Sequence, residues 1–203
     1  LTIQRNRVHI KTVGTIIISI LHTLIGVGCV MVFALAEKGF DKSALGNMSL
    51  FGGVFFMPLF YFIFAKLTKR NMADVFDVFT ICIVFTLMCA RVNCILSGCC
   101  LGTLINSTGA RWPTREAEVV FYAALLAVLI GKIKRGAYIR GTLYPLYMLC
   151  YGVFRFVCEW FRTAGGGSQL HLAHIWAMIS VAVGLSVYLE LQNKNNKRKG
   201  RTR

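Results

Sequence analysis

One arginine lies inside an apolar run that is long enough to cross a lipid bilayer. The run extends from residue 76 to residue 96 and contains Arg91. A helix of about 20 apolar residues spans the hydrocarbon core of a bilayer. A charged side chain at that depth costs about 2.5–3.5 kcal/mol on insertion scales. Arg91 is therefore expected to face a protein interior or a wet cavity and to have an ionic partner.

Other apolar runs supply candidate partners for Arg91. Glu118 lies at the start of one run, and Arg155 and Glu159 lie near the end of another. Arg155 and Glu159 are four residues apart and so share one helix face. The four residues could form an ion-pair network that holds the helices together, or a polar site for a headgroup or substrate. Arginine suits phosphate because its donors form a fixed fork.

The hydrophobicity of the whole chain indicates an all-α membrane protein. Apolar residues make up 56% of the 203 residues and the mean hydropathy is +0.63, which is typical of polytopic membrane proteins. We predict a helical bundle with about six transmembrane helices in a single transmembrane domain, residues 1–203, that ends in a basic tail, 193–203. The predicted spans are 13–36, 49–65, 75–96, 117–131, 143–161 and 174–191.

The positive charges predict the orientation of these spans. The formal net charge is +15, but the basic residues fall in short clusters between apolar runs, which excludes nucleic acid as the expected partner. Sixteen Lys and Arg residues lie on the side that holds both termini, against five on the other. The positive-inside rule then places both termini in the cytoplasm of a bacterial-type plasma membrane. The tail is expected to contact anionic lipids.

Three cysteines follow Arg91 and form a possible thiol site: Cys94, Cys99 and Cys100. One interpretation is a nucleophile or redox pair, with Arg91 stabilising a thiolate. The other is a structural role, either packing at a tight turn between Gly98 and Gly102 or pairing with another cysteine. The sequence contains no zinc-binding signature, so we expect no metal and no cofactor.

Four segments resemble the prolipoprotein diacylglyceryl transferase family. They are MSLFGG at 48–53 (MSFHGG in the family), ARVNCILSGCCLG at 90–102 (GRxxNFxNGExxG), PTREAE at 113–118 (PSQLYE) and YGVFRFVCEWFR at 151–162 (YGxFRFxxEFFR). The resemblance implies a membrane transferase that moves a diacylglyceryl group from phosphatidylglycerol to the lipobox cysteine of a preprolipoprotein and releases glycerol phosphate. Its implied partners are therefore a membrane phospholipid and a lipobox-bearing preprolipoprotein.

The matching positions imply the site residues. Arg91, Arg155 and Glu159 correspond to catalytic positions. The implied lipid-binding residues are Arg91, Gly102, Glu118, Tyr151, Arg155 and Arg162.

The sequence departs from the family pattern at several of these positions. Phe51 stands where the family has a histidine that could accept a proton. Cys94, Ser97 and Cys99 stand where it has asparagine, asparagine and glutamate. Three functions therefore remain open: a lipid-dependent transferase, a non-catalytic lipid-binding member of the fold, and a membrane thiol–redox protein that uses Cys99 and Cys100.

Overall fold

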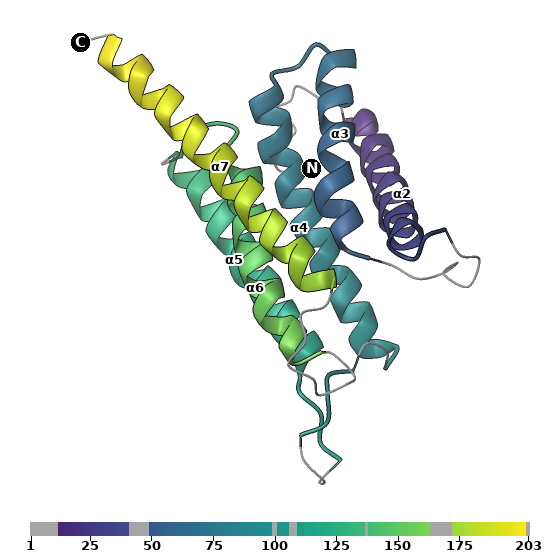
Figure 1. Ribbon diagram of the computed structural model, residues 1–203. Helices are drawn as coiled ribbons and strands as arrows, with labels where there is room; N and C mark the ends of the chain where they lie inside the picture. The colour runs from purple at the N-terminus through teal and green to yellow at the C-terminus, as the bar shows by residue number, and fades with distance from the viewer. Residues whose placement is uncertain are drawn as a thin grey trace. The chain divides into compact units, whose positions relative to one another are not determined.

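The computed structural model describes residues 12–40, 49–98, 101–105, 109–136, 138–162 and 172–201, and most of these residues are helical. Within these ranges the only strand-like feature is an isolated antiparallel bridge between Leu104 and Arg111. The helices are α2 (Thr12–Glu37), α3 (Phe51–Leu67), α4 (Met72–Leu96), α5 (Thr114–Arg135), α6 (Leu143–Trp160) and α7 (Leu172–Arg201) (Figure 1). The predicted all-α class is confirmed.

The lengths and compositions of the helices fit a membrane bundle. Three helices are long and apolar enough to cross a membrane: α2, α4 and α7. The α3 helix is apolar but has 17 residues, and α5 and α6 carry the charged residues described below. Each helix agrees with a predicted span to within a few residues, except that α7 continues as helix to Arg201. The segment predicted as a basic tail, 193–203, is thus helical over most of its length. The orientation of the termini stays a prediction.

The chain divides into two compact units, 1–82 and 83–203, with the boundary inside α4. The single transmembrane domain of residues 1–203 stays a prediction. In the first unit, α2 and α3 can pack closely because Gly52 has no side chain. A Cβ atom at this position would collide with the backbone carbonyl of Cys29. His22 is buried there and lies 3.1 Å from the hydroxyl of Tyr61, with its ring stacked on Phe79.

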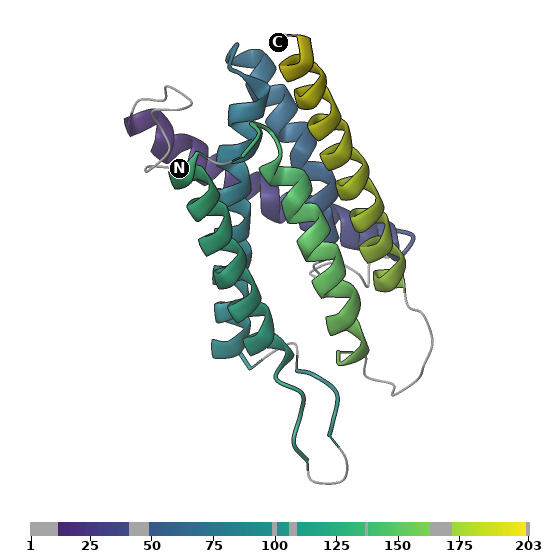
Figure 2. The same cartoon turned by 90° about the vertical axis from the view of Figure 1, so that its left-hand side faces the viewer.

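In the second unit, α6 and α7 lie side by side (Figures 1 and 2). Two glycines allow this close packing. A Cβ at Gly152 of α6 would lie 2.7 Å from Val181, and one at Gly184 of α7 would lie 2.9 Å from the backbone of Pro145. Ser180 of α7 also donates a hydrogen bond to the carbonyl of Met148 at 3.0 Å. The pairing fixes the position of α6.

Three further contacts, made by α6 and by Phe161 directly after it, hold neighbouring segments. Phe121 of α5 stacks on Phe154 of α6 with ring centroids 3.9 Å apart. The segment before α5 is held to the end of α6, because both the backbone N–H and the hydroxyl of Thr103 donate to the carbonyl of Phe161. The ring of Trp112 also packs on Phe161 at 4.7 Å. These contacts place the start of α5 beside the end of α6.

Candidate functional site

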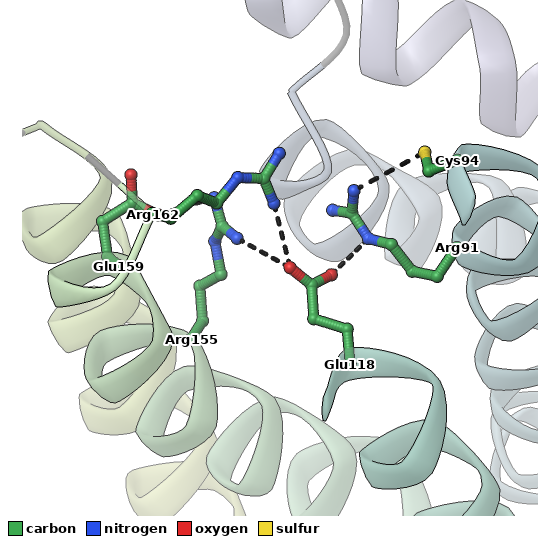
Figure 3. Close-up of polar contacts among 6 residues, drawn as sticks. All are labelled: Arg91, Cys94, Glu118, Arg155, Glu159 and Arg162. Carbon is green, nitrogen blue, oxygen red and sulfur yellow. Dashed lines mark hydrogen bonds and ion pairs between the residues drawn. The ribbon is translucent and has the colours of Figure 1, made fainter. Parts of the chain in front are cut away.

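A buried carboxylate binds three arginines in the second unit. Glu118, in the second turn of α5, forms an ion pair with the Nε of Arg91 on α4. Its other carboxylate oxygen accepts hydrogen bonds from Arg155 Nη1 at 3.3 Å and Arg162 Nη1 at 2.9 Å. Figure 3 shows Glu118 between Arg91 on one side and Arg155 with Arg162 on the other. With Glu159, these residues are called the arginine–glutamate cluster below.

Two of the arginines come from the end of α6. Arg155 also binds Glu159, one turn later on the same helix, with Nη2 and Oε2 2.7 Å apart. The α6 helix ends at Trp160, and the N–H of Arg162 then donates to the carbonyl of Glu159 at 3.1 Å. This turn keeps Arg162 close to the helix end, so its side chain reaches Glu118.

The cluster is largely shielded from the surroundings and carries one net positive charge. The side chains of Arg91 and Glu118 are 6% and 2% exposed, and those of Arg155, Glu159 and Arg162 are 12%, 13% and 20% exposed. Three arginines face two carboxylates, so one positive charge is not balanced within the cluster. Exposure increases from Arg91 towards Arg162, so the α6 side is the more accessible.

The arginines keep hydrogen-bond donors that the carboxylates do not use. Each guanidinium carries several N–H donors in a planar fork. The ion pairs with Glu118 and Glu159 engage one nitrogen of Arg91, two of Arg155 and one of Arg162. Arg155 Nε is buried and has no hydrogen-bond partner within the described residues. Unused donors and an excess positive charge suit an anion with several oxygens, such as a phosphate.

The remaining predicted lipid-binding residues lie near the cluster or on the loop beside it. Tyr151 is fully buried one turn before Arg155 on α6. Gly102 lies on the loop, where a Cβ would collide with the carbonyl of Trp112, and its own carbonyl accepts a hydrogen bond from Arg111 at 3.1 Å. Gly102 therefore has a structural reason to be glycine.

Tyr122 is a further buried residue of the site that was not predicted from the sequence. This tyrosine follows Glu118 by four residues, so both lie on one face of α5, and it is 1% exposed. Its electrostatic interactions include Glu118, Arg91 and Arg155. The spacing from Glu118 was the signal that could have identified it.

The cysteine predictions have different outcomes. Cys94 lies in the last turns of α4, and Arg91 Nη1 is 3.9 Å from its sulfur, so an arginine does lie beside one thiol. Arg115, which was not singled out, contacts the backbone carbonyl of Cys94 at 3.4 Å. Cys99 and Cys100 lie outside the described residues, so the vicinal thiol site stays a prediction.

Comparison with known proteins matches most of the chain to one family. The family model described as prolipoprotein diacylglyceryl transferase matches residues 4–190. Curated relatives named phosphatidylglycerol–prolipoprotein diacylglyceryl transferase include proteins from Coxiella burnetii (strain Dugway 5J108-111), 28% identical over 58% of the chain and 49% of the relative, and Aeromonas salmonicida (strain A449), 28% identical over 64% and 51%. A relative of the same name from Mannheimia succiniciproducens is 26% identical over 68% and 58%. The chain thus spans about half the length of the first relatives that it matches.

Proposed function

The chain belongs to the prolipoprotein diacylglyceryl transferase family, and from that premise we propose that it transfers a diacylglyceryl group from phosphatidylglycerol to a protein cysteine thiol. The names of its relatives supply the lipid and a prolipoprotein acceptor. The observation that carries the proposal is the convergence of three arginines on the carboxylate of Glu118, with donors left over. We place the protein in a bacterial-type plasma membrane.

The proposed reaction exchanges a C–O bond for a C–S bond. The thiol sulfur attacks the carbon of the diacylated glycerol that bears the phosphate. The C–O bond breaks, and its electron pair leaves with the phosphate oxygen. The thiol proton is released to water, so the step balances with no further reactant. A phosphate monoester has a second pKa near 6 and carries about −1.5 to −2 charges at pH 7. Negative charge therefore increases at the phosphate as the reaction proceeds.

The arginine–glutamate cluster is suited to stabilise that charge. Cations fixed in advance around a developing negative charge lower the barrier, because they need no reorganisation during the reaction. We assign Arg155 and Arg91 to the phosphate, and Arg162 to the accessible edge of the same anion. Glu159 positions Arg155 through their ion pair on the same face of α6. Phe51 supplies no proton acceptor, and the balance above does not require one at that position.

An apolar cavity beside the cluster is suited to part of one acyl chain. It has a volume of about 300 Å³ and is lined by Trp112 and Ala117 at the start of α5 and by Val157 and Phe161 at the end of α6. Ala117 directly precedes Glu118, and Phe161 directly precedes Arg162. An acyl chain in this cavity would leave the phosphate close to the arginines.

The test is group transfer with the full chain purified in detergent. Phosphatidylglycerol labelled in its acyl chains is incubated with a peptide that carries a lipobox cysteine, and the label on the peptide is measured. We expect transfer to the cysteine peptide, none to a serine peptide, and a loss of at least about tenfold in Arg155→Lys, which keeps the charge but removes the fork. Transfer that is unchanged in Arg155→Lys would refute the assigned role.

The same experiment separates the other two functions. Lipid retention that depends on Arg155 without any transfer would identify a non-catalytic lipid-binding member, the function that Phe51 favours. Replacement of Cys94, Cys99 and Cys100 by serine should leave transfer intact. Loss of transfer in that triple variant, with Arg155→Lys unaffected, would favour the thiol–redox function.

A further inference from the structure

A second polar site lies at the opposite end of the helices from the arginine–glutamate cluster. A groove of about 410 Å³ is bounded by the end of α5, the connection to α6 and the C-terminal half of α7. In Figure 1 the connection between α5 and α6 lies beside that half of α7. Lys132 in this groove follows Glu118 by fourteen residues, which is about 21 Å along a helix. The groove is therefore not part of the cluster.

The polar lining of the groove comes from one face of α7. Tyr188, Gln192, Asn195 and Asn196 follow the spacing of a single helix face. Gln192 donates a hydrogen bond to the hydroxyl of Tyr188 at 3.1 Å, which orients both side chains. These uncharged groups offer several donors without adding negative charge.

A lysine without a counter-charge faces this polar surface. Lys132 of α5 is half-buried and makes no ion pair within the described residues. The acidic residue of α7 near this end, Glu190, is already paired with Lys194, with their charged atoms 2.6 Å apart, and that pair is exposed. The charged residues that directly adjoin the other lining residues in the sequence are basic, among them Arg140 after Ile139 and Lys197 after Asn196. The groove therefore favours an anion.

The groove lies where α7 changes from apolar to polar. Leu185, Val187 and Leu189 are exposed apolar residues, whereas every residue from Gln192 onwards is polar, basic or glycine. Such a boundary lies at the membrane–water interface, at the depth of lipid headgroups, where tyrosines are also enriched.

We propose that this groove binds the phosphate of an anionic phospholipid headgroup, with Lys132 as the cation and the α7 amides as additional donors. The site is separate from the proposed transfer reaction and does not depend on it. The shared chemistry is a phosphate ester, which could also reach the groove as soluble glycerol phosphate. The experiment therefore includes both sources.

The test measures binding to the full chain in a nonionic detergent. Labelled phosphatidylglycerol, phosphatidylcholine and soluble glycerol phosphate are titrated against the wild type, Lys132→Gln and Asn195→Leu. Lys194→Gln is the matched control, because it removes the same charge from an exposed lysine nearby. Arg155→Lys distinguishes binding at the arginine–glutamate cluster.

We expect Lys132→Gln to weaken one class of phosphatidylglycerol sites about tenfold, the effect of losing a charge-assisted hydrogen bond. Asn195→Leu should weaken the same class and Lys194→Gln should change it less than about twofold. Lys132-dependent binding of glycerol phosphate but not of lipid would retain the phosphate site and assign it to a soluble ester. If Lys132→Gln and Lys194→Gln behave alike for every ligand, the proposal is wrong, whatever Arg155→Lys shows.

Discussion

Replacing Glu118 by glutamine tests whether this carboxylate holds the arginine–glutamate cluster together. Glutamine keeps the size of the side chain and one acceptor oxygen, but it removes the charge. Glu118 is 2% exposed and contacts three guanidinium groups. After the change, Arg155 would keep its ion pair with Glu159, whereas Arg91 and Arg162 would lose theirs with Glu118.

The size of the effect follows from the burial of the ion pairs. Removing one partner of a buried pair costs about 3–5 kcal/mol, because the remaining charge stays uncompensated. Arg155 keeps its contact with Glu159, with the charged atoms 2.7 Å apart. We therefore expect the free energy of unfolding to fall by about 3 kcal/mol, the lower of these two values. At about 2–4 °C per kcal/mol for a chain of this size, Tm should fall by about 6–12 °C.

The assay is thermal unfolding of the full chain in detergent, with Glu116→Gln as the matched control. Glu116 lies on the same helix, but its side chain is 45% exposed and its one ion pair, with Arg115, has a separation of 3.4 Å. The control should lose less than about 1 kcal/mol. Added glycerol phosphate should raise the Tm of Glu118→Gln more than that of the wild type, because an anion can replace the lost charge.

Equal Tm losses in Glu118→Gln and Glu116→Gln would refute this reasoning. A wild-type Tm in Glu118→Gln would do the same, since it would mean that the three arginines do not depend on this carboxylate.

Three further predictions concern binding, packing and orientation. Arg155→Lys should lose phosphatidylglycerol binding by about tenfold or more at the cluster while its unfolding transition in detergent stays cooperative; a lysine variant that binds as the wild type does would contradict the fork argument. Gly152→Ala should destabilise the chain by about 1–3 kcal/mol, because the new Cβ would lie 2.7 Å from a side chain of α7. The control Gly131→Ala should be neutral or stabilising, because a Cβ there would have nothing within 4 Å. Equal melting temperatures of the two variants would show that α6 and α7 are not closely packed. Single cysteines at positions 106 and 195 should react with impermeant reagents from opposite sides of the membrane, and labelling of Asn106→Cys and Asn195→Cys from one side would overturn the predicted topology.

The helices could be predicted from the sequence because the bilayer imposes a minimum length on each apolar run. The span predicted at residues 75–96, for example, became a helix from Met72 to Leu96. The end of α7 was less predictable, since polar residues from Gln192 onwards do not reveal whether the chain stays helical. It does so to Arg201, because lysine, arginine and glutamine are good helix formers.

Four members of the cluster were predictable from their charge and depth, and Arg162 from the family resemblance, but the geometry was not predictable. The cost of leaving a charge in hydrocarbon indicated that Arg91, Glu118 and Arg155 need partners. Their sequence positions give a depth along each helix but no rotation about its axis. The pair of Arg155 and Glu159 could therefore be predicted from their spacing of four residues. The binding of three arginines by Glu118 could not, because it depends on how the helices pack together.

The sharing of Glu118 has a consequence for how this protein can change over generations. Arg91, Arg155 and Arg162 each depend on the same carboxylate. A substitution at position 118 therefore alters the electrostatic environment of all three at once, and residues in such a network do not contribute additively to stability. Losing one arginine along with Glu118 would return the cluster to its present net charge of one, whereas losing Glu118 alone would leave two unbalanced positive charges. These positions are thus expected to be inherited together and, where a lineage abandons them, to be lost together.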